Sequence, residues 1–163
     1  MNRRQLVAGL AVLASLAACA GPPPPPPPTV VNLTLITTPD VNPTTANVPA
    51  PLALRVYQLT SDANFKAAEF FPLYNADAAT LKTDLVHGEN VVLPPGQKKT
   101  ETIKPDPTVK SIGIFAAYRD FQNAVWRVST DIEPNKTTNI TVTAGPAGLK
   151  LDAETVAPPK PAS

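Results

Sequence analysis

Apolar and polar residues alternate over most of residues 30–151, which is the pattern of β-strands with one buried face. The clearest examples are Val30–Thr37 and Leu52–Leu59. Val109–Tyr118 is apolar on both faces, so we expect it to form the most buried strand. Lys98–Ile103 is polar at alternate positions and is predicted to be an exposed edge strand, protected by its lysines.

Further short strands are predicted at Ala124–Ile132, around Val91 and Leu93, around Ile140 and Val142, and around Leu149 and Leu151. In Ala124–Ile132 we expect Val125, Trp126 and Val128 to pack and Arg127 to point outward. A turn is predicted at Pro94-Pro95-Gly96, where glycine tolerates a positive φ. Seven to nine short strands, about ten residues apart, predict an all-β fold, a β-sandwich.

The apolar period changes after Leu59. Phe65, Ala68, Phe70, Leu73 and Tyr74 recur at spacings of two to four, which is typical of helical turns beginning after Ser61 or Asp62 and interrupted by Pro72. A second short element begins at Asp77, and its apolar residues Leu81 and Leu85 fit either a helix or an edge strand. The sequence therefore predicts a helical insertion packed on a sheet.

The first 18 residues have the composition of a signal peptide. Arg3 and Arg4 precede the uncharged apolar run Leu6–Ala18, which as a helix would span about 20 Å, less than the roughly 30 Å of a bilayer core. The run ends in Leu-Ala-Ala-Cys, a lipobox, and Cys19 is the only cysteine of the chain. We predict that Cys19 is lipidated; the alternative, an ordinary secreted precursor, would not require a cysteine there. Three acyl chains exceed the two signals needed for stable anchoring.

Proline is concentrated in two places outside the predicted sandwich. The chain has 21 prolines in 163 residues, and Pro22–Pro28 is an unbroken run that predicts a polyproline II spacer of roughly 22 Å within residues 19–29. Residues 152–163 have few large apolar groups and are predicted to be a disordered tail. The expected organisation is thus signal peptide 1–18, spacer 19–29, β-sandwich domain 30–151 and tail 152–163.

Charge and chemistry argue against an enzyme or a nucleic-acid-binding protein. Without Arg3 and Arg4, the 14 Lys+Arg become 12, against 13 Asp+Glu. His87 is the only histidine, expected at the surface in a turn, so a multi-histidine metal site is excluded. Candidate acidic groups lie near strand ends without a glycine-rich phosphate loop; they are Asp120, Asp131 and Glu133. We expect no catalytic residues, metal or cofactor.

Two features of the sequence are compatible with a binding function. Phe115, Tyr118, Phe121 and Trp126 either form core or line a pocket between the sheets, so a carrier of a small apolar ligand is the alternative function. The connection Thr38–Pro51 contains four prolines, which prevent it from pairing as a central strand. Loops of this length in compact β domains are commonly functional.

Several landmarks resemble, in order and spacing, the TssJ (VasD) family of type VI secretion outer-membrane lipoproteins. They are the strand Leu52–Leu59 (LALRVYQL), Phe65, Phe70–Tyr74, Leu93–Gly96, Ala117–Asp120 and Val125–Arg127. The resemblance implies a transthyretin-like sandwich of two four-stranded sheets with a short helical insertion. It also implies a lipid-anchored location under the outer membrane, facing the periplasm. Ala20 agrees with this location, because an Asp there usually retains enteric lipoproteins in the inner membrane.

The resemblance further implies a structural function and a partner. The family binds the periplasmic C-terminal domain of the inner-membrane protein TssM, largely through the loop between its first two strands. In this chain that loop is Thr38–Pro51, and the implied partner-binding residues are Asp40, Val41, Asn42, Pro43, Thr44, Thr45, Ala46, Asn47 and Val48. The family typically continues from Asn-Pro to an acidic residue and Gly-Arg-Pro, whereas this chain keeps only Asn42-Pro43.

Overall fold

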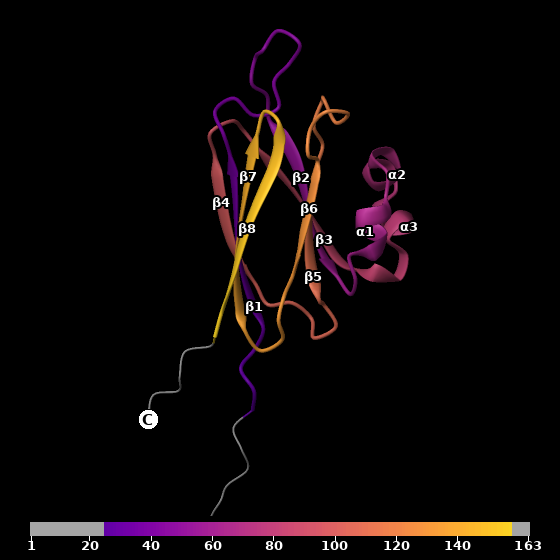
Figure 1. The fold of residues 1–163 in the computed structure, drawn as a ribbon, viewed down its shortest axis with the longest axis vertical. Helices are drawn as coiled ribbons and strands as arrows, with labels where there is room; N and C mark the ends of the chain where they lie inside the picture. The colour runs from indigo at the N-terminus through magenta and orange to yellow at the C-terminus, as the bar shows by residue number, and fades with distance from the viewer. Residues whose placement is uncertain (1–24, 158–163) are drawn as a thin grey trace, which may run out of the picture.

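The computed structural model describes residues 25–157, which form a sandwich of two sheets with short helices beside it (Figure 1). Within this range the strands are β1 (Val30–Thr37), β2 (Leu52–Leu59), β3 (Leu85–Leu93), β4 (Lys98–Ile103), β5 (Ser111–Ala116), β6 (Arg127–Asp131), β7 (Thr137–Gly145) and β8 (Gly148–Val156). The helices are α1 (Ala63–Ala67), α2 (Phe70–Asn75), α3 (Asp77–Leu81) and the 3-10 turn η1 (Lys82–Asp84). The predicted β-sandwich with a helical insertion is confirmed.

The strand order is β4-β1-β7-β8 in the first sheet and β3-β2-β5-β6 in the second. Neighbouring strands are antiparallel except for β1 and β7, which pair in parallel with Leu33 opposite Ile140. The predicted edge strand Lys98–Ile103 is β4, at one edge of the first sheet. Gly96 has the predicted positive φ, 70°, in the turn between β3 and β4.

The main core lies between the two sheets. The inward side chains of β1 meet those of β2, β5 and β7, as the alternating pattern predicts; they include Val31, Leu33, Leu35, Leu52, Leu54, Val56, Ile112, Ile114, Ile140 and Val142. Every residue of β5 is buried, which confirms it as the most buried strand. Its inner face meets the core, and Phe115 on its outer face lies beneath the helices.

A second apolar cluster joins the helices to the outer face of the second sheet. It contains Tyr57, Leu59, Phe65, Phe70, Leu73, Leu81 and Phe115. Gly113 makes room for this packing, because a Cβ there would lie 3.1 Å from Cε1 of Phe65. The helices therefore belong to the folded domain rather than being an appendage.

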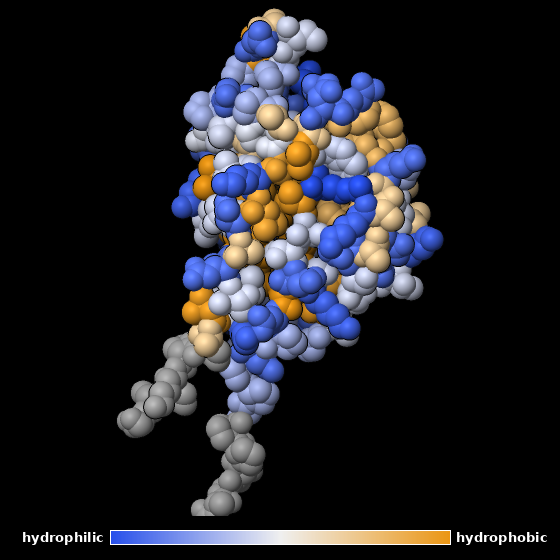
Figure 2. Space-filling model, viewed as in Figure 1, coloured by the Kyte–Doolittle hydropathy of each residue, from blue (hydrophilic) through white to orange (hydrophobic). Residues whose placement is uncertain are grey.

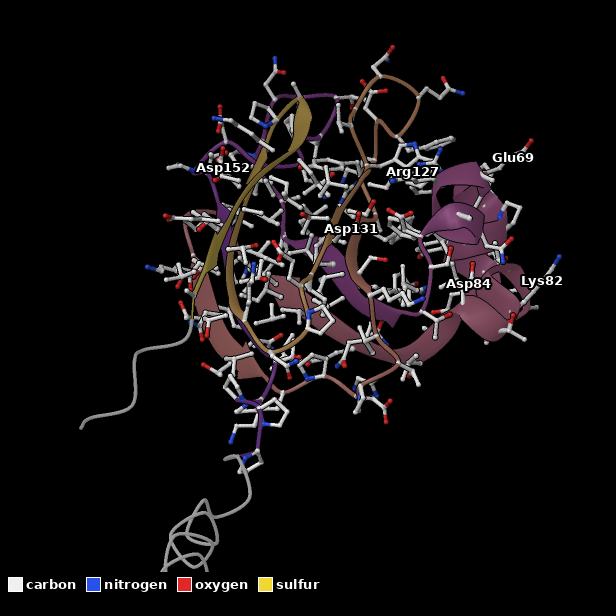
Figure 3. All side chains as sticks on the ribbon, turned by 60° about the horizontal axis from the view of Figure 1, so that its bottom comes forward. Glu69, Lys82, Asp84, Arg127, Asp131 and Asp152 are labelled. Atoms are coloured by element: carbon white, nitrogen blue, oxygen red, sulfur yellow. The ribbon has the colours of Figure 1, made fainter. Side chains whose placement is uncertain are left out.

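Two arginines also hold the helices to the sheet. Arg55 Nη1 of β2 donates to the carbonyls of Leu73 and Tyr74 at the end of α2, at 3.2 and 3.0 Å. Arg127 Nη1 of β6 donates to the carbonyls of Phe65 and Ala68 at the end of α1. Figure 3 shows Arg127 beside the helical segment. Cations suit these positions because the last carbonyls of a helix lack partners within the helix.

The structure corrects the predicted interruption of the helical insertion. The break falls at Ala68, whose ψ of 145° is extended, and not at Pro72. Pro72 lies in the first turn of α2, where a missing N–H costs little because the first N–H groups of a helix have no intrahelical acceptor. The element beginning at Asp77 is a helix, α3, and Leu85 opens β3.

Predictions for the second half of the chain need further corrections. The sequence predicts a disordered tail from Asp152, but β8 continues to Val156 because its backbone pairs with β7, as Asn139 opposite Glu154 shows. His87 is exposed, as predicted, but lies within β3 and not in a turn. Val125 is 53% exposed and lies before β6, while Arg127 points from the sandwich into the helical layer.

Some predictions concern residues outside the described range. These are the signal peptide 1–18, the lipidation of Cys19, the first prolines of the spacer and residues 158–163. Among residues 25–157, no helix is both long and apolar enough to cross a membrane. Over this range, the space-filling view shows mainly hydrophilic side chains at the loop end and an apolar band across the middle of the face (Figure 2).

Candidate binding site at the loop end of the sandwich

The β1–β2 loop, residues 38–51, projects from the end of the sandwich opposite Thr29, where the chain enters β1 (Figure 1). The β3–β4 turn, the β5–β6 connection and the β7–β8 turn lie at the same end. At about 3.3 Å per residue, the eight residues of β1 separate the two ends by roughly 26 Å. The loop and the entry of the chain into β1 therefore lie at opposite ends of the sandwich.

The base of the loop is built into the fold. Val41 is fully buried, and Asn42 is 4% exposed with a φ of 48°, a conformation that asparagine tolerates better than most residues. Asn42 Nδ2 donates to the Pro51 carbonyl at 3.0 Å, and its Oδ1 accepts from the Arg119 amide at 2.9 Å. One side chain thus ties together both ends of the loop and the β5–β6 connection.

The tip of the loop is a tight turn over residues 44–48. The Thr44 amide donates to the Val48 carbonyl at 2.8 Å, and the Asn47 amide donates to the Thr44 carbonyl at 2.9 Å. The Val48 amide also donates to Thr44 Oγ1 at 3.2 Å, and Asn47 has a φ of 58°. The side chain of Val48 is 57% exposed. The tip is therefore conformationally restricted and accessible, which reduces the entropy lost when a partner binds.

A groove of about 520 Å³ separates the loop from the β5–β6 connection. One wall consists of Asn42, Pro43, Thr44, Thr45 and Asn47, and the other of Tyr118, Arg119, Asp120 and Pro146. Tyr118 Oη donates to the Gly145 carbonyl at 3.0 Å and so holds the β7–β8 turn against this wall. Burial raises the pKa of Tyr118, which keeps its hydroxyl protonated as a donor.

The structure divides the nine candidate residues into two groups. Val41 and Asn42 are buried and position the loop, whereas the side chains of Asp40 and of residues 43–48 are at least partly accessible. The second wall of the groove was not among the predicted binding residues. Its only signal in the sequence was the motif Ala117–Asp120, which contributed to the resemblance and indicated no contact with the loop.

The candidate acidic groups do not form a reactive cluster. Asp120 accepts hydrogen bonds from Asn123, Glu133 pairs with Lys136, and Asp131 is exposed on β6. Over residues 25–157 there is no group of three or more side chains suited to bind a metal.

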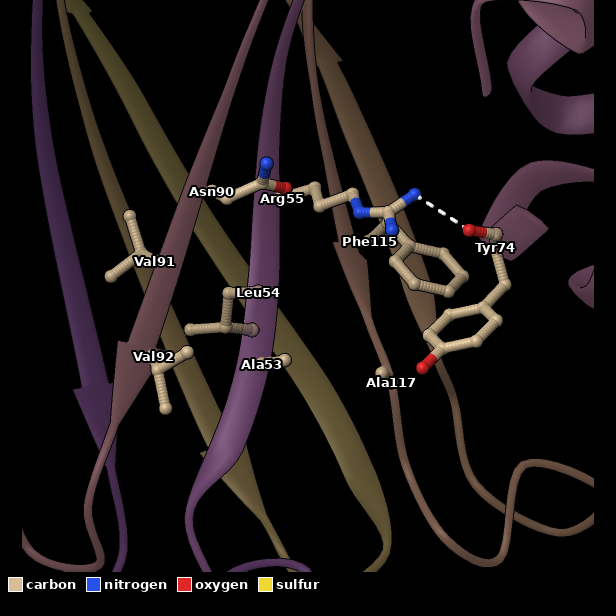
Figure 4. Close-up of a pocket in the computed structure, with 9 residues that line it drawn as sticks. All are labelled: Ala53, Leu54, Arg55, Tyr74, Asn90, Val91, Val92, Phe115 and Ala117. Atoms are coloured by element: carbon tan, nitrogen blue, oxygen red, sulfur yellow. Dashed lines mark hydrogen bonds between the residues drawn. The ribbon is translucent and has the colours of Figure 1, made fainter. Parts of the chain in front are cut away.

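The aromatic residues considered for a pocket between the sheets pack on one another or on the core. Phe70 stacks on Phe121 at 4.3 Å between ring centroids and meets Trp126 edge-on at 5.3 Å. Tyr118 belongs to the main core. A cleft of about 230 Å³ does exist near Arg55 and Tyr74, on the outer face of the second sheet (Figure 4). The aromatic packing and this outer cleft thus give no support to a ligand carried by these aromatic residues between the sheets.

These features define a class of protein: a small β-sandwich that presents exposed loops at the end opposite Thr29, where the chain enters β1. The family model of the type VI secretion lipoproteins, described as VasD, EvfM, TssJ and VC_A0113, matches residues 29–147. The chain belongs to this family. It is a membrane-bound lipoprotein of the type VI secretion system, with a structural and not an enzymatic function.

Solved structures agree with this assignment. The type VI lipoprotein TssJ1 of Pseudomonas aeruginosa is 35% identical, with a TM-score of 0.76 over 81% of this chain and 100% of that one. Lip of Serratia marcescens, a membrane-bound component of the system, is 27% identical, with a TM-score of 0.69 over 76% and 96%. A chain in a structure described as the TssM C-terminal domain from EAEC shares the fold, at 23% identity and a TM-score of 0.63 over 76% and 97%. No match was found among curated proteins.

Proposed function

We propose that this lipoprotein is anchored in the outer membrane through Cys19 and binds the periplasmic C-terminal domain of a TssM-like inner-membrane protein through its β1–β2 loop. The observation that carries the proposal is the position of the loop tip, exposed and restricted at the end of the sandwich opposite the N-terminal attachment. The description of the EAEC structure as a TssM domain supports the choice of partner. The protein would then link the two membranes mechanically.

The buried residues of the loop determine how the proposal is tested. Deleting residues 42–47 would remove Asn42 and disturb the fold, so the contact is better tested at the tip alone. Thr45 and Ala46 are exposed, and neither side chain makes a hydrogen bond within the described residues. Bulky charged groups at these two positions would obstruct a partner while leaving the packing of the loop unchanged.

The test compares Thr45→Arg/Ala46→Arg with Thr83→Arg, which places an arginine at an exposed threonine on the helical side. Each lipidated protein, purified in detergent, is titrated calorimetrically with the periplasmic domain of the TssM-like protein from the same genome. We expect the double variant to raise Kd at least about tenfold, a loss of roughly 1.4 kcal/mol, with no change in Tm. The Thr83 variant should bind normally. Equal affinities for the tip variant and the wild type would refute the loop contact.

A further inference from the structure

The two sheets separate along one side of the sandwich, between their edge strands β6 and β8. The start of β8 meets the segment just before β6, where the Leu149 amide donates to the Val125 carbonyl at 2.7 Å. Gly148 permits this approach, because a Cβ there would lie 2.3 Å from the Val125 amide nitrogen. Beyond this point the strands diverge (Figure 1) and leave a groove of about 410 Å³.

The edge of β8 that faces this groove offers backbone groups for pairing. Since the Leu149 amide points toward β6, the alternation of an antiparallel strand directs the amides and carbonyls of Leu151, Ala153 and Thr155 the same way. The backbone hydrogen bonds of residues 25–157 outside regular elements include none to these three residues. No proline interrupts β8, and its exposed second half lacks a covering element. This is an unpaired edge of the kind to which another strand can be added.

The side chains that line the groove are mixed, and the exposed residues along its rim are acidic. Phe65, Val128 and Leu151 form its apolar part, and Lys66, Arg127 and Ser129 form its polar part. On the outer face of β8, Asp152 and Glu154 are exposed, and on β6 Asp131 is exposed. Figure 3 places Asp131 and Asp152 on separate strands across this side.

Most nearby cations already have partners. Lys66 pairs with Asp62 at 2.7 Å, and Arg127 is bonded to helix carbonyls. Lys150 lies 3.8 Å from Asp152 and partly offsets its charge. The exposed rim of the groove therefore keeps a net negative charge, because Asp131 and Glu154 have no ion pair within the described residues.

We propose that an extended segment of another protein binds here as an added strand on β8, with apolar residues facing the groove and Lys or Arg residues facing outward. Asp152 and Glu154 pair through hydrogen bonds with β7, so opposite a new antiparallel strand they would occupy the non-hydrogen-bonded positions, where side chains lie closest. A Lys or Arg of the added strand opposite Asp152 and another opposite Glu154 would each form an ion pair. About five residues of partner suffice to cover Leu151–Thr155. The proposal concerns a different face from the loop end and does not depend on the loop contact.

Other occupants fit this edge less well. Residues 158–163 of the chain itself (PPKPAS) contain three prolines, which lack the N–H that a strand must donate. A second copy paired antiparallel through β8 would direct its Thr29 end the opposite way, so both copies could not be anchored in one membrane. An anionic lipid surface would be repelled by the acidic rim.

The test uses the full lipidated protein in detergent and a synthetic seven-residue peptide with alternating valine and lysine, capped at both ends. Binding is measured by calorimetry, and the bound edge is located by amide hydrogen exchange. We expect protection of the amides of Leu151, Ala153 and Thr155. The corresponding valine–glutamate peptide should bind at least about tenfold more weakly, because it places like charges opposite Asp152 and Glu154.

Two substitutions at one position separate backbone pairing from side-chain effects. Ala153→Pro removes an edge-facing N–H and should raise Kd about tenfold, whereas Ala153→Thr keeps the N–H and should bind like the wild type. Should Ala153→Pro not fold, Asp152→Asn/Glu154→Gln provides a second test, with an expected loss of severalfold in affinity for the lysine peptide. Equal binding of both peptides, protection confined to β6 or the loop end, or concentration-dependent self-association blocked by Ala153→Pro would overturn the proposal.

Discussion

Replacing Asn42 by alanine should loosen the β1–β2 loop without unfolding the domain. The substitution removes both hydrogen bonds that fasten the loop, one to the Pro51 carbonyl and one from the Arg119 amide. It also places alanine at a φ of 48°, where a Cβ is disfavoured. Because the site is 4% exposed, water does not fully replace the lost bonds.

The expected magnitude follows from these losses. Each hydrogen bond contributes about 1 kcal/mol, and the backbone conformation costs roughly another 1 kcal/mol, giving a loss of about 2 to 3 kcal/mol. Domains of this size are stable by about 5 to 15 kcal/mol, so the sandwich persists. The corresponding fall in Tm is about 6 to 12 °C. A partner that binds the ordered loop must then pay for ordering it, which should raise Kd about tenfold.

Thermal unfolding by circular dichroism and calorimetric titration with the TssM-like domain measure the two effects. Asn47→Ala is the matched control, because Asn47 has a φ of 58° in the same loop but is exposed and makes no side-chain hydrogen bond within the described residues. Asn47→Ala should lower the stability only by the cost of placing alanine at a positive φ, without any loss of side-chain hydrogen bonds. Asn42→Gly relieves the backbone strain and isolates the hydrogen bonds. If Asn42→Ala and Asn47→Ala lowered Tm equally, the bracing function assigned to Asn42 would be wrong.

Two further predictions concern the attachment of the helices. Arg127→Ala should lower the free energy of unfolding, measured in urea, by about 1 to 3 kcal/mol. It removes the hydrogen bonds to the end of α1 and the contact with Trp126, whose ring lies 4.5 Å from the guanidinium. Stability equal to that of wild type would show that these bonds contribute nothing. Burial raises the pKa of Tyr57 from 10.0 to about 12, so its stabilising contribution is complete below pH 10 and is lost as the pH rises toward 12. Tyr57→Phe should therefore reduce the fall in unfolding free energy between pH 10 and 12 by up to about 2.7 kcal/mol. Some fall should remain, because burial also raises the pKa of Tyr118. An unchanged dependence of the unfolding free energy on pH would contradict the contribution assigned to Tyr57.

The strands of the core could be predicted because their two faces differ in polarity. The predicted limits of Val30–Thr37 and Leu52–Leu59 match β1 and β2. The second half of β8 could not be found in this way, since its side chains are exposed and only its backbone pairing with β7 keeps it extended. The interruption predicted at Pro72 was wrong for another reason. The cost of a proline depends on its position within a helix, and the apolar spacing does not fix that position.

The candidate loop could be identified from the sequence, whereas its surroundings could not. Proline content and length indicated the loop, and in the structure its tip is exposed. The separation of buried Val41 and Asn42 from the accessible tip depends on contacts with Arg119, 77 residues further along the chain. The second wall of the groove and the open edge of β8 are products of tertiary packing, for which the sequence contains no local pattern.

The parallel pairing of β1 with β7 constrains how the protein folds. Val30 lies opposite Thr137, so the first strand finds one of its two neighbours only after more than a hundred intervening residues have emerged. Such distant pairing slows folding, because a large loop must close before the contacts form. A chain anchored to the bilayer at Cys19, as proposed above, would therefore keep an apolar strand unpaired on one side, close to the lipid surface, until β7 has arrived.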